Sequence, residues 1–174
     1  GGGGSGTGTL YIELSNPSHT VACDSDGNAT DSFAGSGTTF KVFRGTSQLT
    51  CGHSGVGAND PNTDNTWAIQ SATPSGVTHT HPTVTAGDTA VVYPNIASFT
   101  PNVGAITWTV KVKDPSGGGF QTIYAKQNFQ KNIPGGDGED GEPGADAVDP
   151  VTVVLSNPTA FVACSPNGVP TLSN

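Results

Sequence analysis

The sequence predicts an all-β chain: an immunoglobulin-like β-sandwich, then a short collagen-like Gly-X-Y linker, then the start of a second β module. Three observations lead to this prediction. Short segments of alternating apolar and polar residues, separated by turn-forming residues, fill residues 9–133. Glycine then recurs at every third position from Gly135 to Gly144. Finally, residues 154–164 repeat the pattern of residues 13–23.

The strands are predicted from alternation with a period of two residues. In residues 106–113, for example, every second residue is apolar and the others are threonine or lysine. The 25 glycines and 13 prolines favour many turns, and no window shows a helical period. We expect a hairpin turn at residues 45–46, a turn at residues 74–77 and a long polar loop at residues 52–65. The expected strands are residues 9–14, 19–23, 38–45, 48–51, 66–70, 89–94, 106–113 and 119–129.

The predicted core consists of the large apolar residues of these strands. Full burial of each such side chain contributes roughly 1.5–3 kcal/mol, so about a dozen of them make a domain that can fold alone. The expected core residues are Ile12, Leu14, Val21, Phe40, Val42, Leu49, Trp67, Ile69, Val91, Trp108, Val110, Ile123 and Tyr124.

Four segments are expected along the chain: a flexible glycine-rich segment (1–8), the β-sandwich (9–133), an acidic collagen-like linker (134–150) and the first strands of an incomplete second module (151–174). Glycines 135, 138, 141 and 144 hold the collagen register, in which only glycine fits at the axis of three chains. So few triplets are compatible either with a triple helix or with a solvated linker. The glycines of this register are Gly135, Gly138, Gly141 and Gly144.

The second module is predicted from an internal repeat. Leu-Ser-Asn-Pro and Val-Ala-Cys occur in both copies at a constant offset, with Leu155 in the place of Leu14 and Cys164 in the place of Cys23. Two strands alone do not bury a core. Residues 151–174 therefore either continue into a complete module of the same chain or add strands to a sheet of another chain.

The charge distribution excludes two classes of partner. The net charge is −8, and all six basic residues precede the glycine repeat together with eight acidic ones, whereas the linker holds six acids and no base. An acidic chain without a basic stripe is a poor ligand for nucleic acid and for an anionic membrane surface. No apolar stretch reaches the roughly 20 residues that span a bilayer. We expect neither nucleic-acid binding nor membrane insertion.

Several motifs resemble the repeat modules of bacteriophage central tail fibres and tail-tip host-specificity proteins of the J type. They are the strand opening of residues 14–21, the turn of residues 23–28, the segment Trp67–Val77 and the final strand that leads from Phe129 into the glycine triplets. The resemblance implies a trimeric, elongated, extracellular fibre of the virion tail that contacts other tail proteins and presents host-recognition domains. It implies no catalytic residues and no cofactor, so we do not expect an enzyme.

The cysteines fit one disulfide in each module. Cys23 and Cys51 lie in the first module and Cys164 repeats Cys23, so the pairing predicts a bridge between Cys23 and Cys51. An extracellular virion permits such a bridge. The alternative is a pair of half-buried free thiols, because phage proteins fold in a reducing cytosol.

Two residue groups have the spacing of metal ligands. Asp24, Asp26 and Asn28 alternate as in a calcium loop, but the repeat copy replaces them and no glutamate closes the loop, so turn capping is the favoured interpretation. His79 and His81 share a face if their segment is a strand, and three such pairs around a trimer axis would suit a transition metal. Two exposed polar histidines before a proline are the alternative.

The sequence contains no Gly-X-Ser-X-Gly and no His-Glu-X-X-His motif. The main hypothesis is therefore a structural fibre segment in a virion tail. The first alternative is a carbohydrate-binding module for host surface glycans, in which Tyr93, Tyr124 or Phe43 stacks on sugars and residues 52–65 add polar contacts. The second alternative is a filament subunit on the bacterial cell surface that donates residues 151–174 to a neighbour.

Overall fold

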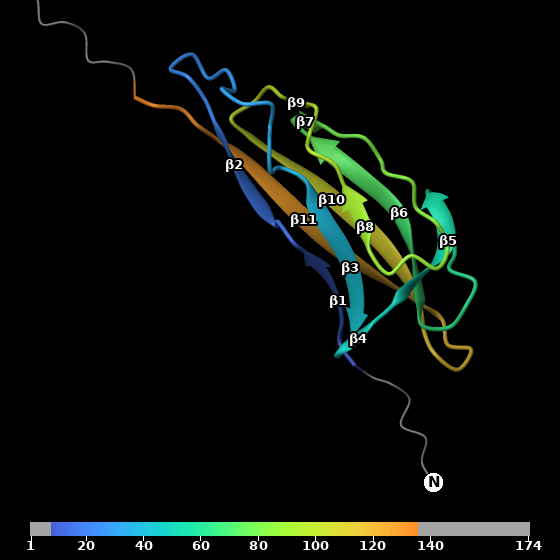
Figure 1. Ribbon diagram of the computed structural model, residues 1–174. Helices are drawn as coiled ribbons and strands as arrows, with labels where there is room; N and C mark the ends of the chain where they lie inside the picture. The colour runs from blue at the N-terminus through green and yellow to red at the C-terminus, as the bar shows by residue number, and fades with distance from the viewer. Residues whose placement is uncertain (1–7, 136–174) are drawn as a thin grey trace, which may run out of the picture. The chain divides into compact units, whose positions relative to one another are not determined.

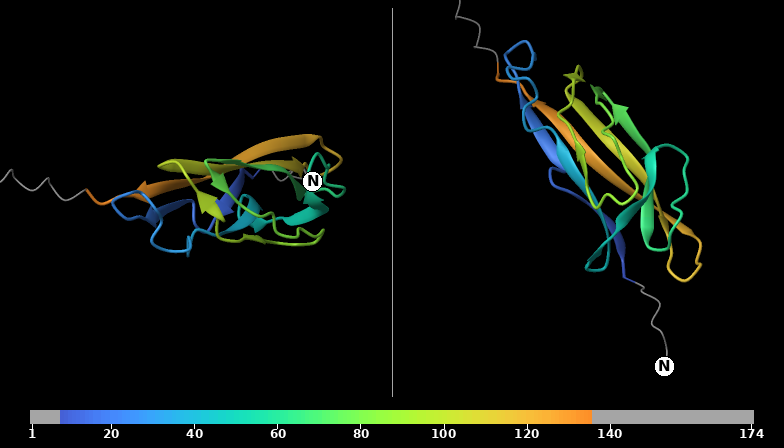
Figure 2. Two further views of the ribbon diagram at one scale, coloured as in Figure 1. Left: turned by 90° about the horizontal axis from the view of Figure 1, so that it is seen from above. Right: turned by 45° about the vertical axis from the view of Figure 1, so that its right-hand side comes forward.

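A computed structural model describes residues 8–135, which form eleven β-strands in two stacked sheets and a small two-stranded ribbon (Figure 1). The two layers are seen edge-on in Figure 2. This confirms the predicted all-β sandwich. The strands are β1 (Leu10–Leu14), β2 (Ser18–Ala22), β3 (Thr38–Arg44), β4 (Ser47–Gln48), β5 (Thr50–Val56), β6 (Thr66–Ser75), β7 (Val77–Thr78), β8 (Val91–Tyr93), β9 (Ser98–Phe99), β10 (Val103–Lys113) and β11 (Phe120–Asn132).

The larger sheet has five strands in the order β2-β11-β10-β6-β5. Its centre is the antiparallel pair of β10 and β11, whose register runs from Val103 opposite Gln130 to Lys113 opposite Phe120. Both edge strands, β2 and β5, pair in parallel with their neighbours. The smaller sheet is built on β3, which pairs with β1 along one side and with β4 and β8 along the other.

The core lies between the two sheets and is dominated by aromatic rings. Phe40 from the smaller sheet packs against Trp67 and Trp108 of the larger one, with ring centroids 5.6 and 6.1 Å apart. These three side chains have no exposed surface. Twelve of the thirteen expected core residues belong to the core: nine are buried, and Ile12, Leu14 and Ile123 pack against it at its edge. Tyr124 does not join them.

Tyr124 is 68% exposed, so its assignment to the core was wrong. It pairs with Thr109, whereas the preceding Ile123 pairs with Val110. Because side chains alternate between the two faces of a sheet, only one of two consecutive residues on β11 can face the core. The register places Ile123 on the inner face and Tyr124 on the outer one.

Two boundaries differ from the prediction because strand pairing overrides local turn signals. The expected turn at residues 74–77 is partly strand: β6 continues to Ser75, with Pro74 opposite Ile106 and Ser75 opposite Ala105. Pro74 is tolerated there because β5 pairs with β6 only as far as Ile69, so the proline lies on a free edge. The chain then turns at Gly76, whose φ is +69°.

The expected polar loop of residues 52–65 begins as a strand, because β5 runs on to Val56. The remaining loop is tied to the larger sheet. Asn59 accepts a hydrogen bond from Gln70 through its carbonyl oxygen, and Asp60 and Asp64 form ion pairs with Lys111 and Lys113. These ties hold the loop against the strands instead of leaving it free.

The described segment begins and ends at opposite ends of the sandwich. Residue 8 lies beside the β3–β4 turn, where the amide of Gly45 donates a hydrogen bond to the carbonyl of Thr9. At the other end, β11 leads past the loop after β2, where the ammonium of Lys131 contacts the carbonyl of Gly27 (Figure 1). The polypeptide therefore passes through the module from end to end.

Candidate binding face

The candidate site is the outer face of the five-stranded sheet, defined here by the outward side chains of β2, β11, β10 and β6. On β11 these are every second residue, and their partners on β10 point the same way: Gln130 with Val103, Asn128 with Ala105, Lys126 with Thr107 and Tyr124 with Thr109. The inward partners of the same strands, such as Ile106 and Trp108, are buried. Alternation thus gives the sheet an apolar inner face and a polar outer one.

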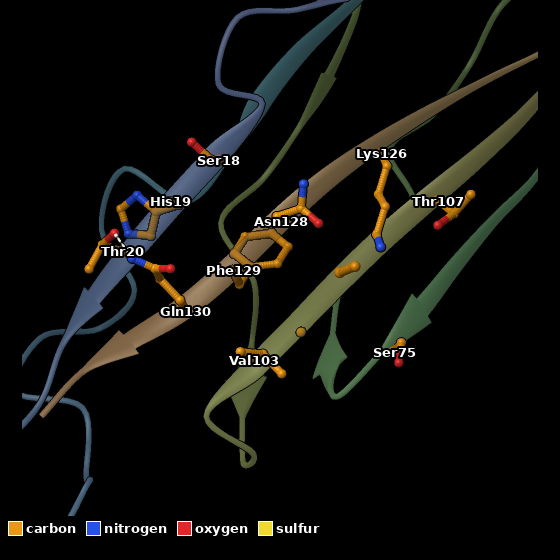
Figure 3. Close-up of a pocket in the computed structure, with 12 residues that line it drawn as sticks. Ser18, His19, Thr20, Ser75, Val103, Thr107, Lys126, Asn128, Phe129 and Gln130 are labelled. Carbon is orange, nitrogen blue, oxygen red and sulfur yellow. Dashed lines mark hydrogen bonds between the residues drawn. The ribbon is translucent and has the colours of Figure 1, made fainter.

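A groove with a volume of about 470 Å³ lies at the β2 end of this face (Figure 3). The small residues Gly104 and Ala105 of β10 line it together with longer side chains of the neighbouring strands. Among the lining side chains, the only hydrogen bond joins Gln130 Nε2 to Thr20 Oγ1, at 3.3 Å. The polar lining side chains are Ser18, His19, Thr20, Ser75, Thr107, Lys126, Asn128 and Gln130.

Among the described residues that line this groove, Lys126 is the only charged one. Most other basic residues of the described segment already have partners: Arg44 pairs with Asp114, Lys111 with Asp60, and Lys131 donates to two carbonyls. Within residues 8–135, Lys126 has no ion pair and no hydrogen bond from its ammonium group. The groove therefore carries a free positive charge.

Exposed apolar surface lies at both ends of the same rows of side chains. Val103, which is 71% exposed, lines the groove. Tyr124 is the outward-facing residue next to Lys126 on β11, on the side away from the groove. Further along, Phe120 is 46% exposed, and the ammonium of Lys111 lies 5.4 Å from its ring centroid. The outer face thus combines polar groups with isolated rings.

Sequence reasoning missed this groove. Thr107, Lys126, Asn128 and Phe129 fall in the predicted strands 106–113 and 119–129, and His19 and Thr20 in the predicted strand 19–23, but the other lining residues were outside the predicted strands. The threonines and lysines of residues 106–113 were recognised as a separate face, but nothing showed which strands are neighbours. The signal that was present is the run of polar residues at positions 126, 128 and 130, each on the side opposite to a core residue. Pairing of β11 with both β10 and β2 turns that run into a groove.

His79 and His81 lie outside any strand, because β7 ends at Thr78. Their rings pack edge to face with centroids 4.6 Å apart, and both contact the ring of Tyr93. His79 Nε2 lies 3.3 Å from the carbonyl oxygen of Ala72, and burial together with His79 lowers the pKa of His81. The condition that the segment be a strand is therefore not met, while a metal on a trimer axis stays a prediction. No group of three or more metal-ligating residues occurs within residues 8–135.

The predicted disulfide between Cys23 and Cys51 is wrong, since both residues are buried free thiols. Cys23 follows β2 and Cys51 lies on β5, which are the two opposite edges of the five-stranded sheet. Four strand spacings of about 4.8 Å separate them by about 19 Å, whereas bridged cysteines have Cα atoms within about 7 Å. Cys164, which would form the bridge of the second module, lies outside the described residues.

Asp24, Asp26 and Asn28 form a capped turn, as the favoured interpretation predicted. Asp24 Oδ1 accepts hydrogen bonds from the backbone amides of Asp26 and Asn28 at 3.0 and 2.8 Å, and Oδ2 accepts one from the side chain of Asn28. The bonds from Asn28 lower the pKa of Asp24. The ammonium of Lys131 donates a hydrogen bond to the nearby carbonyl of Gly27 at 2.7 Å, so a cationic group is already present at this turn.

The aromatic residues proposed for sugar stacking divide into three cases. Tyr93 is only 2% exposed and packs against Trp108, so it cannot contact a ligand. Phe43 is partly buried and stacks on Tyr11, with ring centroids 5.2 Å apart. Tyr124 is the one of the three that is freely exposed. Of the glycine register, Gly135 ends the described segment, and Gly138, Gly141 and Gly144 lie outside it.

Comparison with known proteins found no family model, no curated protein and no solved structure that matches this chain. In the part of the chain that the structure covers, no helix has the length and apolar character needed to cross a membrane.

Proposed function

We propose that this chain is a non-catalytic segment of a trimeric bacteriophage tail fibre, in which β-sandwich modules follow one another in series and support attachment to the host. The single observation that carries this proposal is the path of the chain. Residue 8 and residue 135 lie at opposite ends of the sandwich (Figure 1), and the sequence after residue 150 begins the same module again. A module of this kind is suited to extend a fibre with each repeat.

The residues that the two copies share support this proposal, because they have structural roles in the first copy. Asn16 donates from its side chain to the carbonyls of Gly35 and Gly37, at 2.8 and 3.2 Å. Val21 is completely buried, and Gly27 adopts a φ of +80° that few other residues tolerate. The matching residues at the offset of 141 positions are Asn157, Val162 and Gly168.

The positions that differ between the copies place weaker structural constraints on the side chain. His19 and Thr20 on β2 are replaced by alanine and phenylalanine, and the capping residue Asp24 is replaced by serine, which also caps turns. Shared core and turn positions with variable surface positions are typical of repeats that encode the same fold. The tail of the chain therefore carries the pattern of β1 and β2.

Sedimentation equilibrium of the 174-residue chain tests the assembly. We expect a mass about three times the 17.4 kDa of one chain, without dependence on concentration in the micromolar range. A monomer throughout this range would contradict the trimer. Attachment to a tail is tested by immunogold labelling: antibodies against residues 8–135 should label the tails of purified virions, and labelling of bacterial cells alone would contradict a tail fibre.

A chain ending at Asp149 distinguishes the fibre from a filament built by strand donation. The chain without residues 150–174 should still sediment as a trimer, because the fibre proposal assigns those residues to the next module. If the shortened chain no longer assembles while the complete chain does, the residues act on a neighbouring chain instead.

A further inference from the structure

We propose that the outer face of the five-stranded sheet binds an acidic polysaccharide, with Lys126 pairing with a carboxylate of the sugar chain and Tyr124 stacking on an adjacent ring. This inference adds a ligand to the fibre segment proposed above. Its test measures binding separately from assembly, so that each can fail without the other.

The charge of the groove selects an anionic ligand. Lys126 is the only charged residue in the lining that the structure describes. Its partner on β10, Thr107, is uncharged, and so are Asn128 and the residue opposite it on β2, Ser18. No acidic residue of the described segment lines the groove, and Asp60 and Asp64 of the same sheet's loop are paired with Lys111 and Lys113 at the other end of β10. A carboxylate in the groove would meet a free ammonium group and no competing acid, and such a charge-assisted hydrogen bond is among the stronger ones.

The uncharged lining selects a ligand with many hydroxyl groups. Four side-chain hydroxyls and two amides line the groove, and apart from the bond between Gln130 and Thr20 none of these side chains has a hydrogen-bond partner within residues 8–135. A hydroxyl group both donates and accepts hydrogen bonds, and a side-chain amide donates through its nitrogen and accepts through its oxygen. The lining can therefore pair with sugar hydroxyls that act as donors or as acceptors. A single cation is too few for a nucleic-acid backbone, which needs several phosphate contacts.

The position of Tyr124 selects a chain rather than a single sugar. Tyr124 and Lys126 are two residues apart on β11 and point to the same side, so their Cα atoms are separated by about 6.8 Å. Lys126, Asn128 and Gln130 continue the row into the groove. An extended ligand along β11 would therefore place one ring on Tyr124 while a neighbouring unit reaches Lys126, and the flat exposed ring offers apolar area at a low cost in side-chain entropy.

Isothermal titration of the complete chain with oligogalacturonate tests the proposal, and the carboxyl-reduced form of the same oligomer is the matched neutral probe. We expect the acidic oligomer to bind and the reduced form to bind roughly tenfold more weakly. Binding of the acidic form should also weaken as sodium chloride is raised from 0.1 to 1 M, because the screening length falls from about 10 to about 3 Å.

Three variants assign the binding to this face. Lys126→Gln should weaken binding of the acidic oligomer roughly tenfold and leave the reduced oligomer unaffected, whereas Tyr124→Ala should weaken both by roughly three- to tenfold. Lys41→Gln removes the same charge from β3 of the other sheet and should change neither. Lys126 and Tyr124 are both exposed, so folding should persist, and circular dichroism with a thermal melt verifies it.

Several results would overturn the proposal: no heat of binding with millimolar oligomer, equal affinity for the acidic and reduced forms, or wild-type affinity in Lys126→Gln. Sedimentation equilibrium is run on the same samples. If Lys126→Gln or Tyr124→Ala lowers the assembled mass, the face is an interface between copies of the chain and the polysaccharide is rejected. If the mass is unchanged and binding is absent, the polysaccharide alone is rejected and the fibre proposal stands.

Discussion

Tyr93 carries its hydroxyl group into the core, where it has no hydrogen-bond partner within residues 8–135. Burial raises the pKa of Tyr93 to about 12 from its ordinary 10, although the indole of Trp108 opposes part of this rise. Below pH 10 the hydroxyl is protonated in both states. Between pH 10 and 12 the unfolded chain loses this proton and the folded chain keeps it, so the free energy of unfolding should fall by about 2–3 kcal/mol.

Urea unfolding at pH 8 and at pH 11 should show about half of this loss, roughly 1.4 kcal/mol from Tyr93, and Tyr93→Phe should lack that contribution. Tyr124→Phe is the matched control, because the exposed Tyr124 should leave the decrease as large as in the wild type. At pH 8, Tyr93→Phe should cost less than about 1 kcal/mol, since the change removes an unpaired buried hydroxyl without removing the ring. An equal pH slope in Tyr93→Phe and wild type would contradict the assignment.

The two described cysteines should be chemically hidden in the folded protein. Burial raises the pKa of Cys51, with Asp88 nearby acting in the same direction, and the thiol of Cys51 donates to the carbonyl of His53 at 3.1 Å. Because the thiolate is the reactive form, we expect iodoacetamide to modify Cys23 and Cys51 slowly in buffer and rapidly in urea. Peptide mapping by mass spectrometry reads both sites. A disulfide-linked peptide containing both cysteines in unreduced protein would contradict this prediction.

At the scale of strands, an ion pair joins the two sheets where β3 and β10 end. Arg44 Nη2 lies 2.9 Å from Asp114 Oδ1, and the side chain of Arg44 is only 8% exposed. The hydrogen bond from Gln121, and then Arg44, lowers the pKa of Asp114. Asp114→Ala leaves a largely buried guanidinium without its partner, so we expect a loss of about 2 kcal/mol in the free energy of unfolding at pH 7, measured in urea.

The pH dependence of Asp114→Ala follows from the lowered pKa. The carboxylate stabilises the folded state above the pKa of the unfolded chain, near 3.8, and this contribution is lost as the pH falls through the lower pKa of the folded state. The difference between variant and wild type should therefore shrink in acid. Asp60→Ala is the control, because its pair with Lys111 is more exposed and should contribute less than about 1 kcal/mol. Equal losses in the two variants would show that the inter-sheet pair has no special role.

The strands themselves were largely predictable, because alternation in sequence is a direct consequence of the two faces of a sheet. The segments of β1, β3 and β10 follow this rule and were assigned correctly within a few residues. The prediction was wrong where pairing with a neighbouring strand determines the strand boundary. β6 passes through Pro74 because β10 pairs beside it, and β5 occupies glycine-rich residues that have weak strand preferences of their own.

At the scale of the molecule, the order of the strands was the information that the sequence lacked. Pairing Cys23 with Cys51 was reasonable from their number alone, but β2 and β5 lie at opposite edges of one sheet. The same ordering creates the groove, since Thr107 and Lys126 lie on consecutive strands, whereas Ser18 comes from β2, about a hundred residues earlier in the sequence. Individual side chains of the site were visible in the sequence, whereas their convergence depends on the long-range pairing of β2 with β11.

Residues 8–135 should fold without the rest of the chain, because both sheets and the core between them are complete within this range. Each of the eleven strands pairs with at least one other strand of the same range. We expect a fragment of residues 8–135 to unfold in one cooperative transition, with a midpoint within about 5 °C of that of the same module in the complete chain. Differential scanning calorimetry measures both. A fragment that lacks a cooperative transition, while the complete chain shows one, would mean that the module depends on its neighbours for stability.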